Sequence, residues 1–183
     1  PGVNHTTVAE HTFGLLLGIT KDIQANAVAV QNGEWVAGWK KPVGNEIMGK
    51  TIGVLGLGRI GKEVAIRARA FGMDIIAFDP YFDDSFASAY GVKRCADMNE
   101  VLQNSDVVSL HCFLNEETEN MINAEKIAGS IRAGHGIVLA GNHCRNADPM
   151  AIGEVAKAVD CSLYSMASWH LFNQNWFMRW AIP

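Results

Sequence analysis

Three glycines in the pattern Gly-x-Gly-x-x-Gly constrain the fold of this 183-residue chain more than any other feature; they are Gly56, Gly58 and Gly61. The pattern follows a mostly apolar run over residues 50–57, which predicts a buried strand. It opens a segment over residues 60–71 whose apolar side chains recur at helical spacing. A glycine turn between a strand and a helix is the first unit of many parallel, doubly wound sheets.

The residues of this turn have expected roles in holding a phosphate group. Gly56 permits the tight turn, Gly58 lets the backbone approach a pyrophosphate, and Gly61 lets the helix pack close to the strand. The start of the helix, at Arg59 and Ile60, presents backbone N–H groups and the positive end of the helix dipole to the anion. Arg59 can add a charged hydrogen bond from the same turn.

Asp79 lies 18 residues beyond Gly61, at the end of a second predicted strand over residues 73–78. A carboxylate in this place accepts hydrogen bonds from the ribose hydroxyls of NAD and repels the 2′-phosphate of NADP. No arginine follows within several residues to offset that repulsion. The sequence therefore predicts NAD as the cofactor. The alternative is a turn without a ligand and an aspartate that only ends a strand.

Helical and strand periodicities alternate through the rest of the chain. Helices are predicted over 82–90, 98–104, 124–131 and 148–159, and strands over 92–94, 107–111, 136–140 and 162–166. This alternation predicts an α/β fold of Rossmann type, a doubly wound parallel sheet with helices on both faces. We expect one NAD-binding domain over 1–183, made of a long helix and tryptophan-rich arm (1–45), a Rossmann core (46–160) and an aromatic tail of uncertain role (161–183).

A single long helix is predicted from about residue 7 to residue 32, apolar around much of its circumference. Such a helix is normally buried, either in a core or between subunits. The connector after it carries Trp35 and Trp39, which require a surface to cover them. That surface is either the same domain or a second subunit, and the sequence leaves both open.

Composition excludes several classes of partner. The net charge is −4 and no basic run is present, which argues against a nucleic-acid surface. No stretch reaches the roughly 20 apolar residues of a membrane span. The N-terminus lacks the features of a signal peptide, so we expect a cytoplasmic protein with no membrane partner. The 4 cysteines form no Cys-x-x-Cys pair, and adjacent His-Cys residues point to opposite faces of a strand, so no metal site is predicted.

Several of these motifs resemble the D-isomer-specific 2-hydroxyacid dehydrogenase family. The resemblance lies in the glycine turn of residues 56–61, in Ala70-Phe71-Gly72-Met73 and in Asp79-Pro80. Residues 106–111 and 118–123 are similar to the family segment that passes beneath the nicotinamide ribose.

The resemblance implies that His111, Cys112 and Thr118 also contact the cofactor. It further implies an enzyme with a substrate domain and an NAD domain, the latter forming a homodimer. The implied reaction transfers a hydride between NAD and a small D-2-hydroxy acid, or its 2-keto product.

The last 50 or so residues depart from the family pattern at the catalytic positions. The family uses a histidine as acid/base, a glutamate that orients it and an arginine that holds the substrate carboxylate. Here the turn reads Gly141-Asn142-His143-Cys144-Arg145-Asn146, and His143 falls in the arginine's place if Asp148 is aligned with the aspartate that follows in the family. Arg145, two residues away, is the candidate substitute for that contact, and a solvated loop arginine is the alternative. No glutamate follows Glu154, and His170 lies among aromatic residues. Phe113 stands where the family has a proline, and we expect the substrate domain to lie outside this chain.

Two functions remain open at this point. The chain is either part of an NAD-dependent 2-hydroxyacid dehydrogenase, inactive by itself, or a non-catalytic NAD(H)-binding dimeric module that resembles dehydrogenase-like corepressors. The full-length gene discriminates between them, because a substrate domain and a downstream histidine turn indicate the enzyme.

Overall fold

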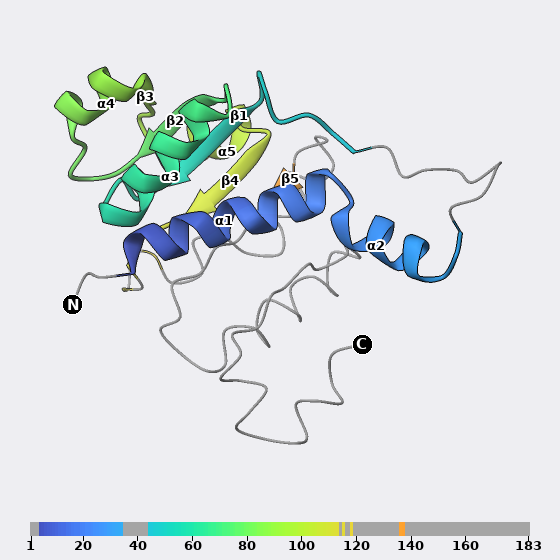
Figure 1. Cartoon of the computed structure of the whole chain (residues 1–183). Helices are drawn as coiled ribbons and strands as arrows, with labels where there is room; N and C mark the ends of the chain where they lie inside the picture. Colours follow the sequence, from blue (N-terminus) through green and yellow to red (C-terminus); the bar gives the residue numbers. More distant parts are fainter. Residues whose placement is uncertain (1–3, 35–43, 114, 116–117, 119–135, 138–183) are drawn as a thin grey trace.

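The computed structural model describes residues 4–34, 44–113, 115, 118 and 136–137. Within this part five strands form one sheet in the order β3-β2-β1-β4-β5, and every neighbouring pair is parallel (Figure 1). The strands are β1 (Thr51–Leu55), β2 (Asp74–Phe78), β3 (Val92–Arg94), β4 (Val107–Leu110) and β5 (Gly136–Ile137). The helices are α1 (His5–Thr20), α2 (Ile23–Gln31), α3 (Arg59–Ala70), α4 (Asp84–Tyr90) and α5 (Met98–Asn104). The chain runs outward from β1 to one edge of the sheet and then returns to build the other half, so the predicted doubly wound parallel sheet is confirmed.

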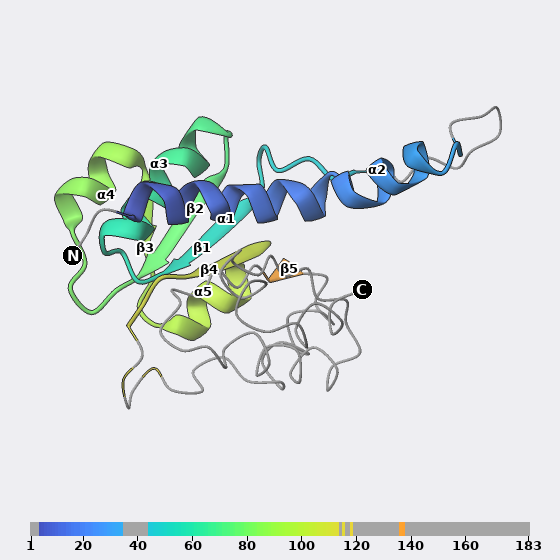
Figure 2. The same ribbon diagram turned by 60° about the horizontal axis from the view of Figure 1, so that its bottom comes forward.

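Helices cover both faces of the sheet, as predicted (Figure 2). α3, α4 and α5 each connect one parallel strand to the next along the chain. Ile52 and Val54 of β1 belong to a buried cluster with side chains of α1 and α3. Leu55 and Val108 belong to a second buried cluster with side chains of α5 on the other face. The central strands are therefore buried on both sides, which explains why their sequences are almost continuously apolar.

The single helix predicted over residues 7–32 is wrong, because α1 ends before Lys21 and Asp22 and α2 begins after them. Asp22 has a left-handed backbone φ of 50°, which aspartate tolerates better than most residues. The end of α1 is bonded to the segment before β1. The Asn45 N–H donates to the Thr20 carbonyl (2.6 Å), and Lys21 Nζ donates to the Asn45 carbonyl (2.8 Å). The break therefore coincides with a tertiary contact that local periodicity does not contain.

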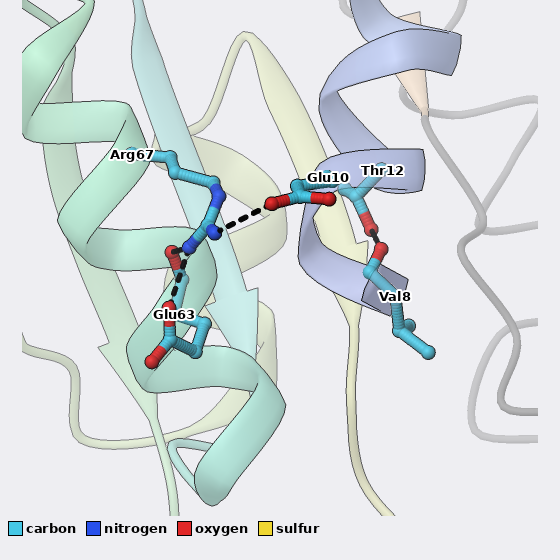
Figure 3. Close-up of polar contacts among 5 residues, drawn as sticks. All are labelled: Val8, Glu10, Thr12, Glu63 and Arg67. Carbon is cyan, nitrogen blue, oxygen red and sulfur yellow. Dashed lines mark hydrogen bonds and ion pairs between the residues drawn. The ribbon is translucent and has the colours of Figure 1, made fainter. Parts of the chain in front are cut away.

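α1 packs against α3 through both apolar and charged contacts. Phe13 of α1 stacks on Phe71, which caps the end of α3, with ring centroids 5.1 Å apart. Arg67 of α3 pairs with Glu63 on its own helix (2.5 Å) and lies 3.4 Å from a Glu10 oxygen of α1 (Figure 3). These contacts hold α1 over the sheet beside α3. No helix in the described ranges is long and apolar enough to cross a membrane.

Several predictions lie outside the described residues. They concern Trp35 and Trp39, the helices over 124–131 and 148–159, the strand over 162–166, the aromatic tail and most of the strand over 136–140, of which β5 is the beginning. The division of the chain at residues 45 and 160 stays a prediction.

Candidate functional site

The candidate site lies at the edge of the sheet where β1, β2 and β4 end. These strands are adjacent and parallel, so the residues that follow them meet there (Figure 1). Two backbone hydrogen bonds continue the pairing past the strand ends. The Gly56 N–H donates to the Phe78 carbonyl (2.9 Å), and the His111 N–H donates to the Leu55 carbonyl (2.7 Å). The glycine turn, Asp79 and His111 are thereby brought to one edge, where ligands of such sheets bind.

The glycines of the turn have distinct steric surroundings. Gly56 has a φ of 95°, and a Cβ there would lie 2.8 Å from backbone atoms of His111 and Cys112. A Cβ on Gly61 would lie 2.0 Å from the Gly56 carbonyl oxygen, so only glycine allows α3 to start this close to the turn. A Cβ on Gly58 would meet nothing within 4 Å. Gly56 and Gly61 are thus required by the protein itself, whereas Gly58 borders open space that a ligand can enter.

The N-terminus of α3 borders the same open space. Gly58 is its N-cap residue, and no side chain caps it. The first amides of a helix have no intrahelical partner, so they remain available to an anion. Arg59 is exposed at the first position of this 12-residue helix, and Ile60 follows it half-buried. This arrangement has the chemistry of a phosphate-binding turn.

Asp79 is held in place by two backbone amides. Its Oδ2 accepts a hydrogen bond from the Leu57 N–H (2.6 Å), and its Oδ1 accepts one from the Tyr81 N–H (2.7 Å). A carboxylate has about four lone-pair sites, so both oxygens can also accept from ribose hydroxyls. The sequence predicted the ribose contact but not the bond to Leu57. Asp79 therefore fixes the glycine turn in addition to the role predicted for it.

His111 and Cys112 follow β4 and are half-buried. Burial lowers the pKa of the His111 imidazole to about 4, so this ring is neutral at physiological pH. Burial raises the pKa of the Cys112 thiol, and the negative charge of Asp79 adds to the rise. The residues that follow β4 therefore carry an uncharged imidazole and a protonated thiol, and neither bears a negative charge that would repel a dinucleotide.

Thr118 closes a turn after β4. Its hydroxyl donates to the Phe113 carbonyl (2.5 Å) and accepts from the Asn115 N–H (2.8 Å). The Thr118 N–H in turn donates a hydrogen bond to Asn115 Oδ1 (2.9 Å). The Thr118 side chain thus shapes the loop, and its contact with a cofactor stays a prediction.

Sequence reasoning missed Ser109, which is fully buried on β4 with its hydroxyl 2.7 Å from the His111 imidazole. The signal was present, because residues two apart on a strand share a face. Arg145 and His170 lie outside the described residues. Among the residues that are described, no group of three His, Cys, Asp or Glu side chains could hold a metal ion.

Comparison with known proteins identifies the family. Residues 13–138 match the D-isomer specific 2-hydroxyacid dehydrogenase, NAD binding domain. The chain belongs to this family. It is 41% identical over 128 residues to a D-3-phosphoglycerate dehydrogenase of Methanocaldococcus jannaschii and, over the same length, to a hydroxypyruvate reductase of Thermotoga maritima. A solved D-lactate dehydrogenase from Salmonella has the same fold, with a TM-score of 0.72 at 28% identity. The family and the NAD cofactor predicted from the glycine turn are therefore confirmed.

The chain spans only part of these relatives. The two sequence matches cover 70% of this chain but 24% and 40% of the relatives, and the Salmonella structure is covered to 47%. The matched region, residues 13–138, is the NAD-binding domain, and the chain spans less than half the length of each of these relatives.

Proposed function

We propose that this chain holds NAD for an oxidoreductase that transfers a hydride between NAD and a D-2-hydroxy acid. One observation carries the proposal: Gly58, whose Cβ position is open, is the uncapped start of α3 and follows Leu57, whose N–H is bonded to the Asp79 carboxylate (2.6 Å). An anion fits the start of the helix, and a pair of ribose hydroxyls fits the carboxylate. Relatives named for phosphoglycerate, hydroxypyruvate and D-lactate support a 2-hydroxy acid as the substrate class.

Each residue of the site has a proposed task. The amides that follow Gly58, together with Arg59, bind the pyrophosphate of NAD. Asp79 accepts from the adenosine ribose and disfavours the 2′-phosphate of NADP. The loop that follows β4, with Cys112 and Thr118, borders the other half of the dinucleotide. When bound, NAD supplies the hydride acceptor for the reaction.

The proposed catalytic contact of this chain is with the substrate carboxylate. Arg145 is proposed to bind the substrate carboxylate through a planar, two-pronged contact. The acid/base histidine and its glutamate have no matching position in this sequence, so the chain is proposed to show little or no turnover by itself. The altered turn over residues 141–146 favours the second candidate, a non-catalytic NAD(H)-binding module.

A homodimer through this domain is proposed from the surface of α2. Ile23, Val28 and Val30 expose 55%, 46% and 54% of their surface, and α2 buries only Ala29. Ile23 and Val30, seven residues apart, lie on one face of the helix, and exposed apolar side chains of this kind are typical of a surface that another subunit covers. The dimer and the cytoplasmic location remain predictions.

Gly58→Ala tests the cofactor site without a steric clash in the protein. The added methyl meets nothing within 4 Å, and because alanine caps a helix less well than glycine, the free energy of unfolding should fall by no more than about 1 kcal/mol. The methyl group occupies the space proposed for the pyrophosphate. NADH titrated against the chain and followed by fluorescence should bind roughly tenfold or more weakly to the variant. Gly14→Ala in α1, which also meets nothing within 4 Å, is the matched control and should bind as the wild type does. Equal NADH affinity in all three proteins would refute the proposed position of the pyrophosphate.

A further inference from the structure

Ser109 and His111 form a pair at the end of β4 that the proposed cofactor contacts do not explain. Their side chains lie on the same face of the strand, with Ser109 Oγ 2.7 Å from His111 Nε2. The Ser109 side chain is 0% exposed. Within the described residues its hydroxyl has no hydrogen-bond partner other than this imidazole. Within that part of the chain, the imidazole is therefore the group that satisfies this buried hydroxyl.

The position of the hydrogen atom between the two side chains determines the tautomer of His111. If Nε2 carried the proton and donated to Ser109, both the hydroxyl hydrogen and Nδ1 would lack a partner within the described residues. If the hydroxyl donates to Nε2, the serine is satisfied and the ring proton is at Nδ1, so only this N–H of the pair is left for a further acceptor among those residues. The low pKa of His111, caused by burial, means that the ring carries only one proton at neutral pH. Hydrogen-bond satisfaction thus favours the Nδ1–H tautomer.

His111 borders the glycine turn through its backbone, since its carbonyl atoms lie 2.8 Å from where a Cβ on Gly56 would be. Nδ1 itself has no partner within the described residues. A neutral N–H donor at this edge suits an oxygen acceptor of a ligand that occupies the turn.

We propose that His111 donates its Nδ1–H to an oxygen of the bound dinucleotide, and that Ser109 is the positioning residue that selects this tautomer. The proposal deepens the NAD-binding function and rests on it. The acceptor is an oxygen of the pyrophosphate or of the ribose that follows it. One such hydrogen bond should contribute roughly threefold to tenfold in affinity.

The tautomer can be measured on the free chain. Long-range ¹H–¹⁵N spectra of the histidine-labelled protein at neutral pH distinguish the two forms, and the His111 signals are identified by their loss in His111→Asn. The wild type should show His111 protonated at Nδ1, and Ser109→Ala should shift it toward a mixture. If His111 of the wild type is protonated at Nε2, the proposal is overturned, whatever the affinity for NADH.

Two neutral variants of His111 test which of the two ring nitrogens donates to the ligand. The side-chain N–H of asparagine falls near Nδ1, and that of glutamine falls near Nε2. In calorimetric titrations with NADH, His111→Asn should bind within about twofold of wild type and His111→Gln roughly threefold to tenfold more weakly. An equal loss in both variants would overturn the proposed donor.

Smaller ligands locate the acceptor and keep the proposal separate from the proposed function. A loss in His111→Gln with ADP as well as NADH assigns the contact to a pyrophosphate oxygen. A loss with ADP-ribose but not ADP assigns it to the second ribose. If the wild type binds none of these ligands, the proposed function and the ligand contact both fail, whereas the spectrum still decides the tautomer.

Discussion

Gly61→Ala should destabilise the chain because α3 starts so close to the glycine turn. The new Cβ would lie 2.0 Å from the Gly56 carbonyl oxygen, whereas ordinary contact begins at 3.4 Å, so the helix must retreat by about 1.4 Å. The neighbours are the Gly56 backbone and, at 3.2 Å, the buried side chain of Val54, and neither can yield locally. Overpacking of this kind costs about 1–3 kcal/mol, and alanine returns up to about 1 kcal/mol of helix propensity. Because the overlap is with backbone, we expect the upper end of the overpacking cost, and therefore a net loss of about 2 kcal/mol in the free energy of unfolding.

Gly14→Ala is the matched control for this prediction. It is also a glycine-to-alanine change within a helix, but its methyl group meets nothing within 4 Å, so it should stabilise the chain by up to about 1 kcal/mol. Urea unfolding followed by far-UV circular dichroism measures both variants under the same conditions. If Gly61→Ala were as stable as Gly14→Ala, the close approach of α3 to the turn would be wrong.

Three further predictions follow from the site and its surroundings. His111 takes up a proton near pH 6.5 in the unfolded chain but only near pH 4 in the folded chain, so lowering the pH across that window should lower the free energy of unfolding by up to about 3 kcal/mol. Urea titrations at several pH values should show a smaller loss in His111→Gln. Asp83→Asn should lower Tm at neutral pH, since the wild-type carboxylate caps α4 and pairs with Lys62 at 2.5 Å. In strong acid the wild-type carboxylate is also protonated, so calorimetry should find a smaller difference in Tm between wild type and variant. Asp79→Ala should narrow the ratio of NADH to NADPH affinities in parallel titrations and also lower Tm, because the Leu57 N–H loses its acceptor. An unchanged ratio would remove the selective role proposed for this carboxylate.

The parts of the fold that the sequence predicts are those fixed by local patterns. The strand over residues 51–55 and the helix after Gly58 follow from apolar periodicity, and the steric reasons for Gly56 and Gly61 follow from the spacing of the motif. The break at Asp22 does not follow, because it coincides with contacts between the end of α1 and Asn45. Periodicity carries no information about a partner more than 20 positions away.

The candidate site divides in the same way. The approach of Asp79 to the glycine turn follows from the order of parallel strands, but its bond to the Leu57 N–H depends on the exact course of the turn. The Ser109–His111 pair was recoverable from the two-residue repeat of a strand. The tautomer of His111 could not be predicted in this way, because it depends on the burial of Ser109 and on the absence of other partners for the Ser109 hydroxyl within the described residues.

Calorimetric titration of the wild-type chain with NADH, and separately with NADPH, tests the central claim most directly. The claim is that the edge formed by the glycine turn and Asp79 binds NAD in preference to NADP. Saturable binding of one NADH per chain, with clearly weaker binding of NADPH, is the predicted result. No saturable NADH binding, or an affinity for NADPH equal to or higher than that for NADH, would contradict the account.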